Sequence, residues 1–307
     1  MKLRLSIVIP VYRGSETISP LVERLIRELG EILTQIVLVN DDSPDDSDLV
    51  CRSIVERYPD RVRYLRLGRN FGEHNAVMAG LNHADGDYFV VMDDDFQNPP
   101  EEVIRLVEHA VSYGFDVVYS RYEEKRHDRF RNFGSRLADF AATCFAGKPS
   151  GIYLSSFKCM NAWLKEQVIR YDGPFPYLDG IVLNATRSIG VVTVRHDLRT
   201  LGKSGYTFSK LFALWLRIFV NFSVVPLRIS TFVGLAMSLI GAIMACLVLW
   251  EKLTFSDLPL GWASIYSAIL VFSGLQMLMI GLLGEYVGRA YLTLNRMPQY
   301  TIREDLP

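Results

Sequence analysis

Short apolar blocks alternate with charged stretches over roughly the first 189 residues of the chain. Apolar runs of this length predict buried strands, and the charged segments with helical spacing predict helices between them. Strands are expected at residues 3–12, 34–43, 61–68, 86–95 and 115–121. Helices are expected at 15–32, with Ser15 as its N-cap, at 70–84 and at 99–114. This order predicts an α/β fold with a mainly parallel sheet covered on both faces.

The charge nearly vanishes after Arg228, where two long apolar stretches follow at 229–250 and 263–284. Each holds about the 20 residues that a membrane-spanning helix needs. We therefore expect two transmembrane helices within 229–288, with buried helices of a soluble core as the alternative. The segment 208–228 is expected to lie in the headgroup plane as an amphipathic helix. The alternative for that segment is an ordinary helix packed on the preceding domain.

Basic residues flank both apolar stretches and set the expected orientation. They are Lys210, Arg217 and Arg228 before the first stretch, and Arg289, Arg296 and Arg303 after the second. The positive-inside rule then places residues 1–207 and a tail at 289–307 in the cytoplasm, with a short loop outside. Glu285 and Arg289 are spaced four apart and are expected to pair.

Composition narrows the class of protein further. The net charge of −1 lacks the basic excess expected of a nucleic-acid-binding protein. The four cysteines have no CxxC spacing and indicate free thiols in a reducing compartment. No glycine-rich phosphate loop is present.

Acidic residues gather where two of the predicted strands end. Asp41 and Asp42 lie at the end of one strand, and Asp93, Asp94 and Asp95 at the end of another. Ligands of parallel sheets bind beyond the carboxyl ends of the strands, so these acids point to one shared site. Successive strand residues face opposite ways, which would let Asp93 and Asp95 converge on a Mg²⁺ or Mn²⁺ ion. A solvated, Asp-rich turn is the alternative.

Five motifs occur in an order that resembles the polyisoprenyl-phosphate glycosyltransferases, over almost the whole chain. They are IVIPVY, VNDDS, RNFGEHNAVMAG, DDDFQNPP and GLLGEYVGRAY. The family includes dolichol-phosphate mannose synthase and bacterial undecaprenyl-phosphate glycosyltransferases. The resemblance implies a GT-A fold, which is Rossmann-like, and a bacterial inner-membrane enzyme. It would move a sugar from a nucleotide sugar, expected to be a UDP-sugar, to a polyprenyl phosphate. Tetramers are expected by analogy only.

The resemblance also implies roles for individual residues. The nucleotide sugar would be bound by Pro10, Tyr12, Asp41, Asp93, Asp94 and Asp95. The metal would be held by Asp93, Asp95 and Gln97. The acceptor phosphate would be gripped by Arg121, Arg131 and Ser135, and by Arg199 and Lys203 of a closing loop. Catalysis would therefore rest on Asp93, Asp95, Arg121 and Arg131.

Two departures from the family pattern bear on mechanism. Arg13-Gly14 stands where the family usually has Asn-Glu, and Ser156 stands where relatives have an aspartate proposed as a base. A phosphate monoester has a second pKa of about 6 and is largely ionised at neutral pH. It needs positioning rather than a base. We therefore expect direct, inverting transfer that gives a β-linked product from an α-linked donor.

Two alternatives stay open at this stage. A membrane polysaccharide synthase would usually carry a QxxRW motif, which this chain lacks. A non-catalytic membrane scaffold that binds ligand without turnover is favoured only by the substitutions at Arg13-Gly14 and Ser156. The transferred sugar also stays open among glucose, galactose, N-acetylhexosamines and modified pentoses.

Overall fold

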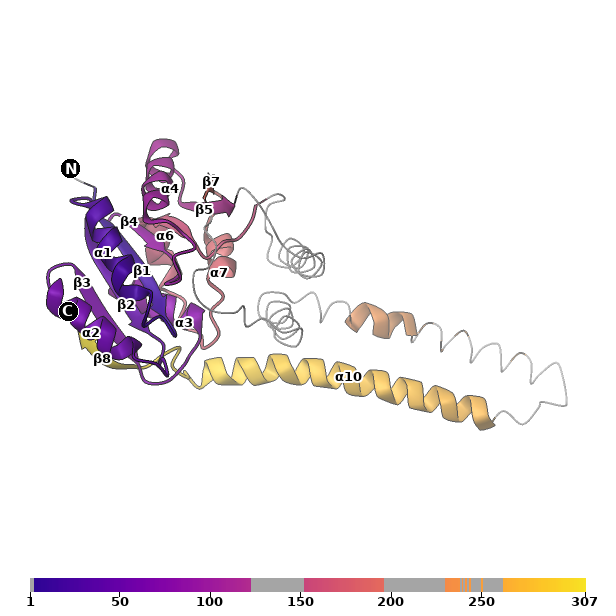
Figure 1. Cartoon of the computed structure of the whole chain (residues 1–307). Coiled ribbons are helices and arrows are strands. Elements are labelled where there is room, and N and C mark those ends of the chain that lie inside the picture. The colour runs from indigo at the N-terminus through magenta and orange to yellow at the C-terminus, as the bar shows by residue number, and fades with distance from the viewer. Residues whose placement is uncertain are drawn as a thin grey trace. The chain divides into compact units, whose positions relative to one another are not determined.

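The computed structural model describes residues 3–122, 152–195, 230–237, 239, 241, 243, 250 and 262–307. The chain divides into two compact units (Figure 1). The first consists of Met1–Trp215 together with Arg296–Pro307, and the second of Leu216–Asn295. The last twelve residues therefore belong with the α/β unit, whereas the sequence analysis had separated 289–307 as a tail.

The first unit is built on an eight-stranded sheet in the order β7-β5-β6-β4-β1-β2-β3-β8. The strands are β1 (Leu5–Val11), β2 (Leu33–Asn40), β3 (Val62–Leu67), β4 (Tyr88–Val91), β5 (Val117–Tyr122), β6 (Lys158–Asn161), β7 (Ile189–Val194) and β8 (Ile302–Leu306). Strands β6 and β8 run antiparallel to their neighbours, and the other pairings are parallel. The predicted mainly parallel sheet is confirmed.

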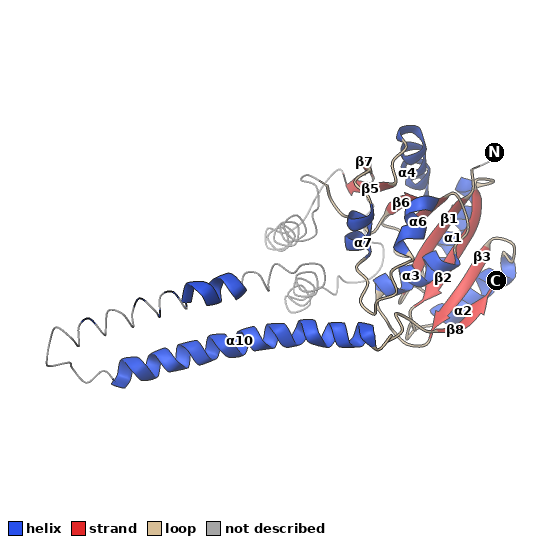
Figure 2. Cartoon of the chain, turned by 180° about the vertical axis from the view of Figure 1, so that it is seen from behind, coloured by secondary structure: helices blue, strands red, loops and turns tan. Residues whose placement is uncertain are grey.

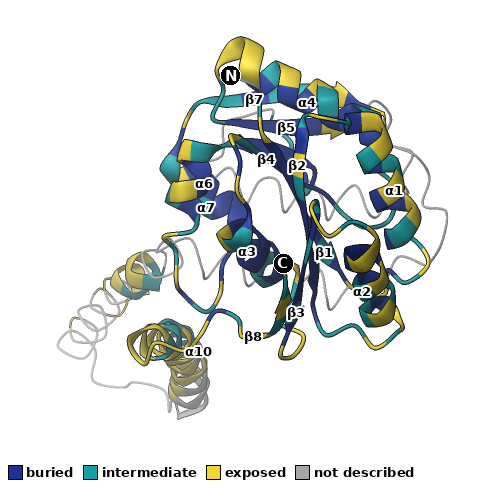
Figure 3. Cartoon of the chain, turned by 90° about the vertical axis from the view of Figure 1, so that its left-hand side faces the viewer, coloured by how far each residue is buried: buried dark blue, intermediate teal, exposed yellow. Residues whose placement is uncertain are grey.

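Helices cover both faces of this sheet (Figures 2 and 3). One face packs against α1 (Ile18–Leu29), α2 (Ser47–Arg57) and α4 (Pro100–Tyr113). The other packs against α3 (Glu73–His83), α6 (Ala162–Val168) and α7 (Leu178–Ala185). The α/β layering expected from the sequence is thus present.

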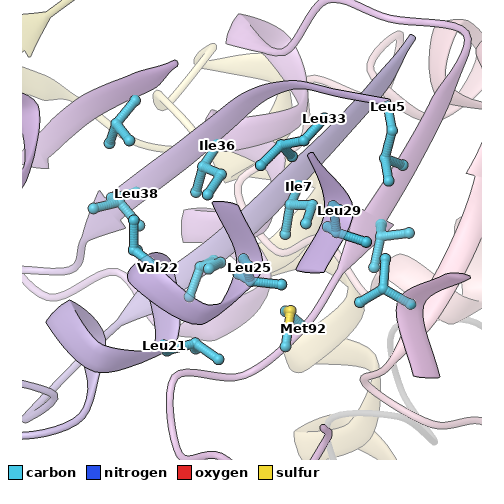
Figure 4. Packing of buried hydrophobic residues seen from close by; sticks show 14 of the residues in the cluster. Leu5, Ile7, Leu21, Val22, Leu25, Leu29, Leu33, Ile36, Leu38 and Met92 are labelled. Atoms are coloured by element: carbon cyan, nitrogen blue, oxygen red, sulfur yellow. The ribbon is translucent and has the colours of Figure 1, made fainter. Parts of the chain in front are cut away.

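The pattern of apolar residues explains this layering. In α1, Leu21, Val22, Leu25 and Leu29 recur at helical spacing and are buried. They meet alternate residues of the sheet, as Figure 4 shows for Ile7, Leu33, Ile36 and Leu38. The neighbouring strand residue Val8 points to the opposite face and joins the second core cluster. Each central strand is therefore buried on both sides.

Two local expectations need correction, and several elements were not predicted. The first helix begins at Ile18, not at Ser15, and Ser15 donates its backbone N–H to Asp45 Oδ2 instead (3.2 Å). The helices α2, α6 and α7 and the strands β6, β7 and β8 were not predicted. Strand β4 ends at Val91, so Asp93 to Asp95 lie beyond it and the strand alternation used to orient them does not apply.

The second unit contains helix 230–237 and the long helix α10 (Trp262–Leu294). The predicted pair on α10 is confirmed, because Arg289 Nε lies 2.9 Å from Glu285 Oε1. Within the described part of the chain, no helix has both the length and the apolar character that crossing a membrane requires. The expected segment 208–228 lies outside the described residues, as do residues 229, 238, 240, 242 and 244–249 of the first apolar stretch.

Candidate active site

Strained backbone marks the carboxyl ends of three adjacent strands. Arg13 follows β1, Asp42 follows β2 and Phe96 follows the Asp93–Asp95 turn after β4. All three have positive φ angles, of 60°, 51° and 61°. Such angles are uncommon for residues other than glycine, and they cluster at functional sites. The edge chosen from the sequence is therefore also the edge where the backbone departs from regular geometry.

The three aspartates point to different neighbours. Ser156 Oγ donates to Asp93 Oδ2 at 2.6 Å, from the segment that leads into β6. The backbone N–H of Tyr12 donates to Asp94 Oδ2 at 3.4 Å, from the end of β1. Asp95 Oδ1 accepts from the backbone N–H of Gln97, within its own turn (3.1 Å). Because β4 lies between β1 and β6, Asp93 and Asp94 engage opposite sides of the strand.

Asp94 is wedged against the turn after β1. A Cβ atom on Gly14 would lie 2.2 Å from Asp94 Oδ2, so a side chain at this position would require the Asp94 carboxyl group to move. Desolvation, followed by the negative charge of Asp93, raises the pKa of Asp94 to about 7. Gly14, a departure from the family pattern, thus has a direct structural reason.

Asp41 has a task that the sequence did not predict. Its carboxyl group is buried, and its two oxygens accept the backbone N–H groups of Phe71 (2.7 Å) and Gly72 (2.8 Å). Desolvation raises its pKa, although those two hydrogen bonds act in the opposite direction. Asp41 therefore holds the turn before α3. Its expected contact with a nucleotide base stays a prediction.

The other two predicted nucleotide-binding residues lie on β1 or just beyond it. Pro10 pairs in register with Val39 of β2 near the carboxyl end of the strand. Tyr12 is 46% exposed, and the Arg13 guanidinium lies 5.6 Å from its ring centroid. An exposed aromatic ring beside a cation at this edge is suited to a flat, anionic ligand.

Sequence reasoning missed a buried ion pair beneath this edge. Lys158 Nζ donates to Asp179 Oδ1, and Tyr119 OH donates to the same oxygen at 2.9 Å. The side chains of Lys158 and Asp179 are 3% and 9% exposed. The signal available was a lysine between the apolar residues Phe157 and Cys159, at the start of β6. A charged residue buried in a strand requires a partner, but the sequence does not identify which one.

Glu73, the first residue of α3, adds a further carboxyl group near the aspartates. Its pKa is raised to about 7, first by desolvation and then by the negative charge of Asp93, although part of its surface stays exposed to solvent. Its neighbour His74 meets Tyr177 edge to face, with ring centroids 5.4 Å apart. Desolvation lowers the pKa of His74, which favours a neutral imidazole.

The acceptor side is described only in part. Arg121 lies near the end of β5, exposed, in register with Thr193 of β7. The adjacent Tyr122 hydroxyl lies 3.3 Å from Asn98 Oδ1, in the segment after the aspartates, and 3.0 Å from Ser155 Oγ. The end of β5 is thereby tied to the aspartate turn. The remaining predicted acceptor residues lie outside the described part of the chain: Arg131, Ser135, Arg199 and Lys203.

The carboxylates suit a divalent cation whose coordination shell is completed by substrate oxygens. Across the described residues, no three His, Cys, Asp or Glu side chains converge into a complete metal site. Mg²⁺ and similar ions commonly take one or two protein carboxylates and complete their shell with phosphate oxygens and water. Asp93 and Asp95 supply carboxylate oxygens of that kind. Asp94 instead accepts from the Tyr12 N–H and packs against Gly14.

Two family models match the chain. Glycosyl transferase family 2 matches residues 6–176, which span the aspartate site, and the model named GtrB C-terminal hairpin matches residues 225–290. These matches cover the two units separately.

Curated relatives match nearly end to end. Undecaprenyl-phosphate 4-deoxy-4-formamido-L-arabinose transferase of Photorhabdus laumondii is 30% identical, over 98% of this chain and 94% of that protein. The protein of the same name from Edwardsiella ictaluri is 32% identical, over 97% of this chain and 93% of its own length.

Solved structures share the fold of the first unit. Glucosyl-3-phosphoglycerate synthase of Mycobacterium tuberculosis, in complex with Mn²⁺, UDP and phosphoglyceric acid, aligns with a TM-score of 0.54. That alignment covers 71% of this chain and 76% of the other, at 16% identity. At this identity the likeness concerns the fold, which is of the GT-A type.

Proposed function

This chain belongs to glycosyltransferase family 2, and on that premise we propose that it transfers a sugar from a nucleotide sugar to a polyprenyl phosphate. The observation that carries the proposal is the aspartate turn at the carboxyl edge of a GT-A sheet, with Asp93 tied to Ser156 and Asp94 to Tyr12. Near-full-length similarity to undecaprenyl-phosphate transferases supports a polyprenyl acceptor. Complexes of a fold relative with UDP support UDP as the nucleotide.

On the donor side, Asp93 and Asp95 would hold a Mg²⁺ or Mn²⁺ ion, with Gln97 beside them. A bound cation offsets the charge that develops on a departing diphosphate and orients the donor. The protein's own part is to fix the two carboxyl groups in advance. Ser156 orients Asp93 by its hydrogen bond, and the Gln97 N–H orients Asp95. The exposed Tyr12 ring is available to the nucleotide base.

On the acceptor side, a polyprenyl phosphate arrives already ionised and needs no base. Arg121 lies near the end of β5, on the same edge of the sheet as the aspartates, and offers a planar set of donors to the phosphate. Arg131, Ser135, Arg199 and Lys203 complete the acceptor site in this proposal. The Ser156 hydroxyl donates a hydrogen bond to Asp93, so it serves the donor side rather than replacing a base. Direct attack would invert the anomeric carbon, which the anomeric coupling in the NMR spectrum of the product reports.

We also propose that the second unit anchors the enzyme in the bacterial inner membrane, through spans at 229–250 and 263–284. Apolar side chains exposed along α10 support this: Ile265, Ile269, Phe272, Met277, Ile280, Leu283 and Val287. Lipid would cover such a surface, which soluble monomers seldom expose. The proposal places residues 208–228 at the membrane interface and residues 1–207 in the cytoplasm. It also includes assembly into a homo-oligomer.

A panel assay tests the proposed activity. Membranes containing the full-length chain are incubated with radiolabelled undecaprenyl phosphate and one nucleotide sugar at a time. Membranes containing the Asp95→Asn variant serve as the matched control. The proposal predicts a sugar-linked lipid with at least one UDP-sugar, and none with the variant. Binding of UDP-sugars without any lipid product across the panel would instead favour the non-catalytic scaffold.

A further inference from the structure

After α10 the chain returns to the α/β unit, and its last residues are attached there by several kinds of contact. Strand β8 pairs antiparallel with β3, with Tyr64 opposite Leu306. Arg63 binds Asp305 through two hydrogen bonds (2.8 and 2.6 Å). Arg52 binds Glu304 in the same two-pronged manner. We name residues 299–306 the C-terminal strap.

The strap contacts the turn that precedes α3. The backbone N–H of Gly68 donates to the Thr301 carbonyl at 2.8 Å. A Cβ atom on Gly68 would lie 2.7 Å from Thr301 Oγ1, so the two segments are in contact at this point. The far end of the same turn is held by Asp41, through Phe71 and Gly72. The turn is thus fixed between the strap at one end and Asp41 at the other.

A second contact joins the strap to the segment between α6 and α7. Gln299, only 8% exposed, donates from Nε2 to the carbonyls of Tyr171 (3.3 Å) and Gly173 (3.0 Å). Tyr177, at the end of that segment, packs edge to face on His74 of α3. The strap therefore contacts two of the segments that surround the start of α3.

A chain of hydrogen bonds leads from β8 to the end of β2. Glu304 binds Arg52, and Arg52 Nε lies 3.3 Å from Asp48 Oδ1. The same oxygen accepts from Tyr64 OH (2.5 Å). That hydroxyl in turn accepts from Asn40 Nδ2 (2.9 Å), directly before Asp41. This route and the Thr301–Gly68 contact converge on the region around Asp41.

We propose that the C-terminal strap is a positioning element for the nucleotide-binding edge, so that disturbing it weakens nucleotide binding. The inference rests on the proposed function for the identity of the ligand. Covering the edge of β3 would require only the strand pairing of β8. The contacts of Gln299 and Thr301 precede that strand, and they are made to the segments around α3 and the turn that Asp41 holds. The last residues of the chain thereby help to shape the site.

The close approach at Gly68 gives a matched set of variants. Gly68→Ala places a methyl group against Thr301 Oγ1, and Thr301→Ala removes that oxygen while keeping the backbone carbonyl. UDP binding to the full-length protein in detergent, with Mn²⁺ present, is measured by isothermal titration. Gly68→Ala should weaken UDP binding at least about fivefold, a typical size for coupling between sites. Thr301→Ala alone should bind normally, and the double variant should recover.

Several outcomes would overturn the inference. If the wild-type chain binds UDP and Gly68→Ala binds it equally well, the strap does not position the site. A lower melting temperature with an unchanged Kd would identify β8 as an edge cover only. If Gly68→Ala does not fold, Arg63→Asp and the charge-swapped Arg63→Asp/Asp305→Arg carry the test, with rescue of UDP affinity expected in the double variant. Failure of the wild-type chain to bind any UDP-sugar contradicts the proposed function instead.

Discussion

At the scale of residues, two departures from the family pattern are explained by direct neighbours. Gly14 is small because the carboxyl group of Asp94 occupies the space a side chain would need. Ser156 donates a hydrogen bond to Asp93. An aspartate at position 156 would instead place a second negative charge directly against the Asp93 carboxylate. Each of the two departures therefore lies in direct contact with a residue of the aspartate turn.

Changing Ser156 to Ala should lower activity moderately. The substitution removes one hydrogen bond to a charged group, about 1.5–3 kcal/mol, or roughly 10- to 150-fold in rate if it is felt fully in the transition state. Ser156→Thr keeps the hydroxyl and should be close to wild type. Initial rates of lipid-linked sugar formation measure both. A loss in Ser156→Ala as complete as that in Asp95→Ala would contradict the view that the acceptor phosphate needs no base.

The buried pair beneath the site should be sensitive to the loss of one partner. Lys158→Met leaves Asp179 buried without its cation and should lower the free energy of unfolding by about 3–5 kcal/mol. In Lys158→Met/Asp179→Asn, the uncharged amide can still accept from Tyr119, and much of the stability should return. Chemical denaturation of the three proteins measures this. Equal stability of the single variant and wild type would show that Lys158 is not needed to neutralise Asp179.

At the scale of elements, the sequence predicted the strands and helices whose apolar residues form short runs or recur at helical spacing. The apolar runs of β1 to β5 and the spacing in α1 and α4 are readable along the chain. Strand β8 has the polar sequence IREDL. Its acidic residues bind Arg63 of β3 and Arg52 of α2, which stabilise it in the sheet. Strand β6 contains Lys158, whose partner is 21 residues away. Such tertiary partners cannot be read from the segment itself.

The candidate site divides in the same way. The acids were found because they follow apolar runs, but their directions depend on Ser156, Tyr12 and Gly14, which approach from other elements. The role of Asp41 toward a ligand stays a prediction, and its oxygens also accept from the turn before α3, which the sequence did not indicate. Residue type thus indicated where the site lies, and the packing of neighbouring elements decided how each side chain is used.

The attachment of β8 should depend on pH. The Arg63 hydrogen bond lowers the pKa of Asp305 below the usual value of 3.8. A lowered folded-state pKa gives stability that is present above the unfolded-state pKa and is lost as the pH falls through the folded-state value. Asp305→Asn should therefore be less stable than wild type at pH 7, and the difference should shrink below about pH 3.8. Thermal unfolding at several pH values tests this. A difference that stays constant down to acid pH would contradict the role of the Arg63–Asp305 pair.

At the scale of the whole molecule, the chain combines a GT-A unit with a second unit. In sequence, the second unit is inserted between two segments of the first. The chain enters Leu216–Asn295 from the α/β domain and returns through Arg296 to complete its sheet. Both the first and the last strands in sequence thus belong to one sheet.

The most direct test of the central claim uses purified full-length protein, a UDP-sugar that the panel identifies and undecaprenyl phosphate. Product formation is followed during titration with a chelator and after Mn²⁺ or Mg²⁺ is restored, in wild type and in Asp93→Asn and Asp95→Asn. The account predicts that turnover stops with the chelator, returns with the ion, and is lost in both variants at every ion concentration. Undiminished turnover in excess chelator, or full activity of the two variants, would contradict it.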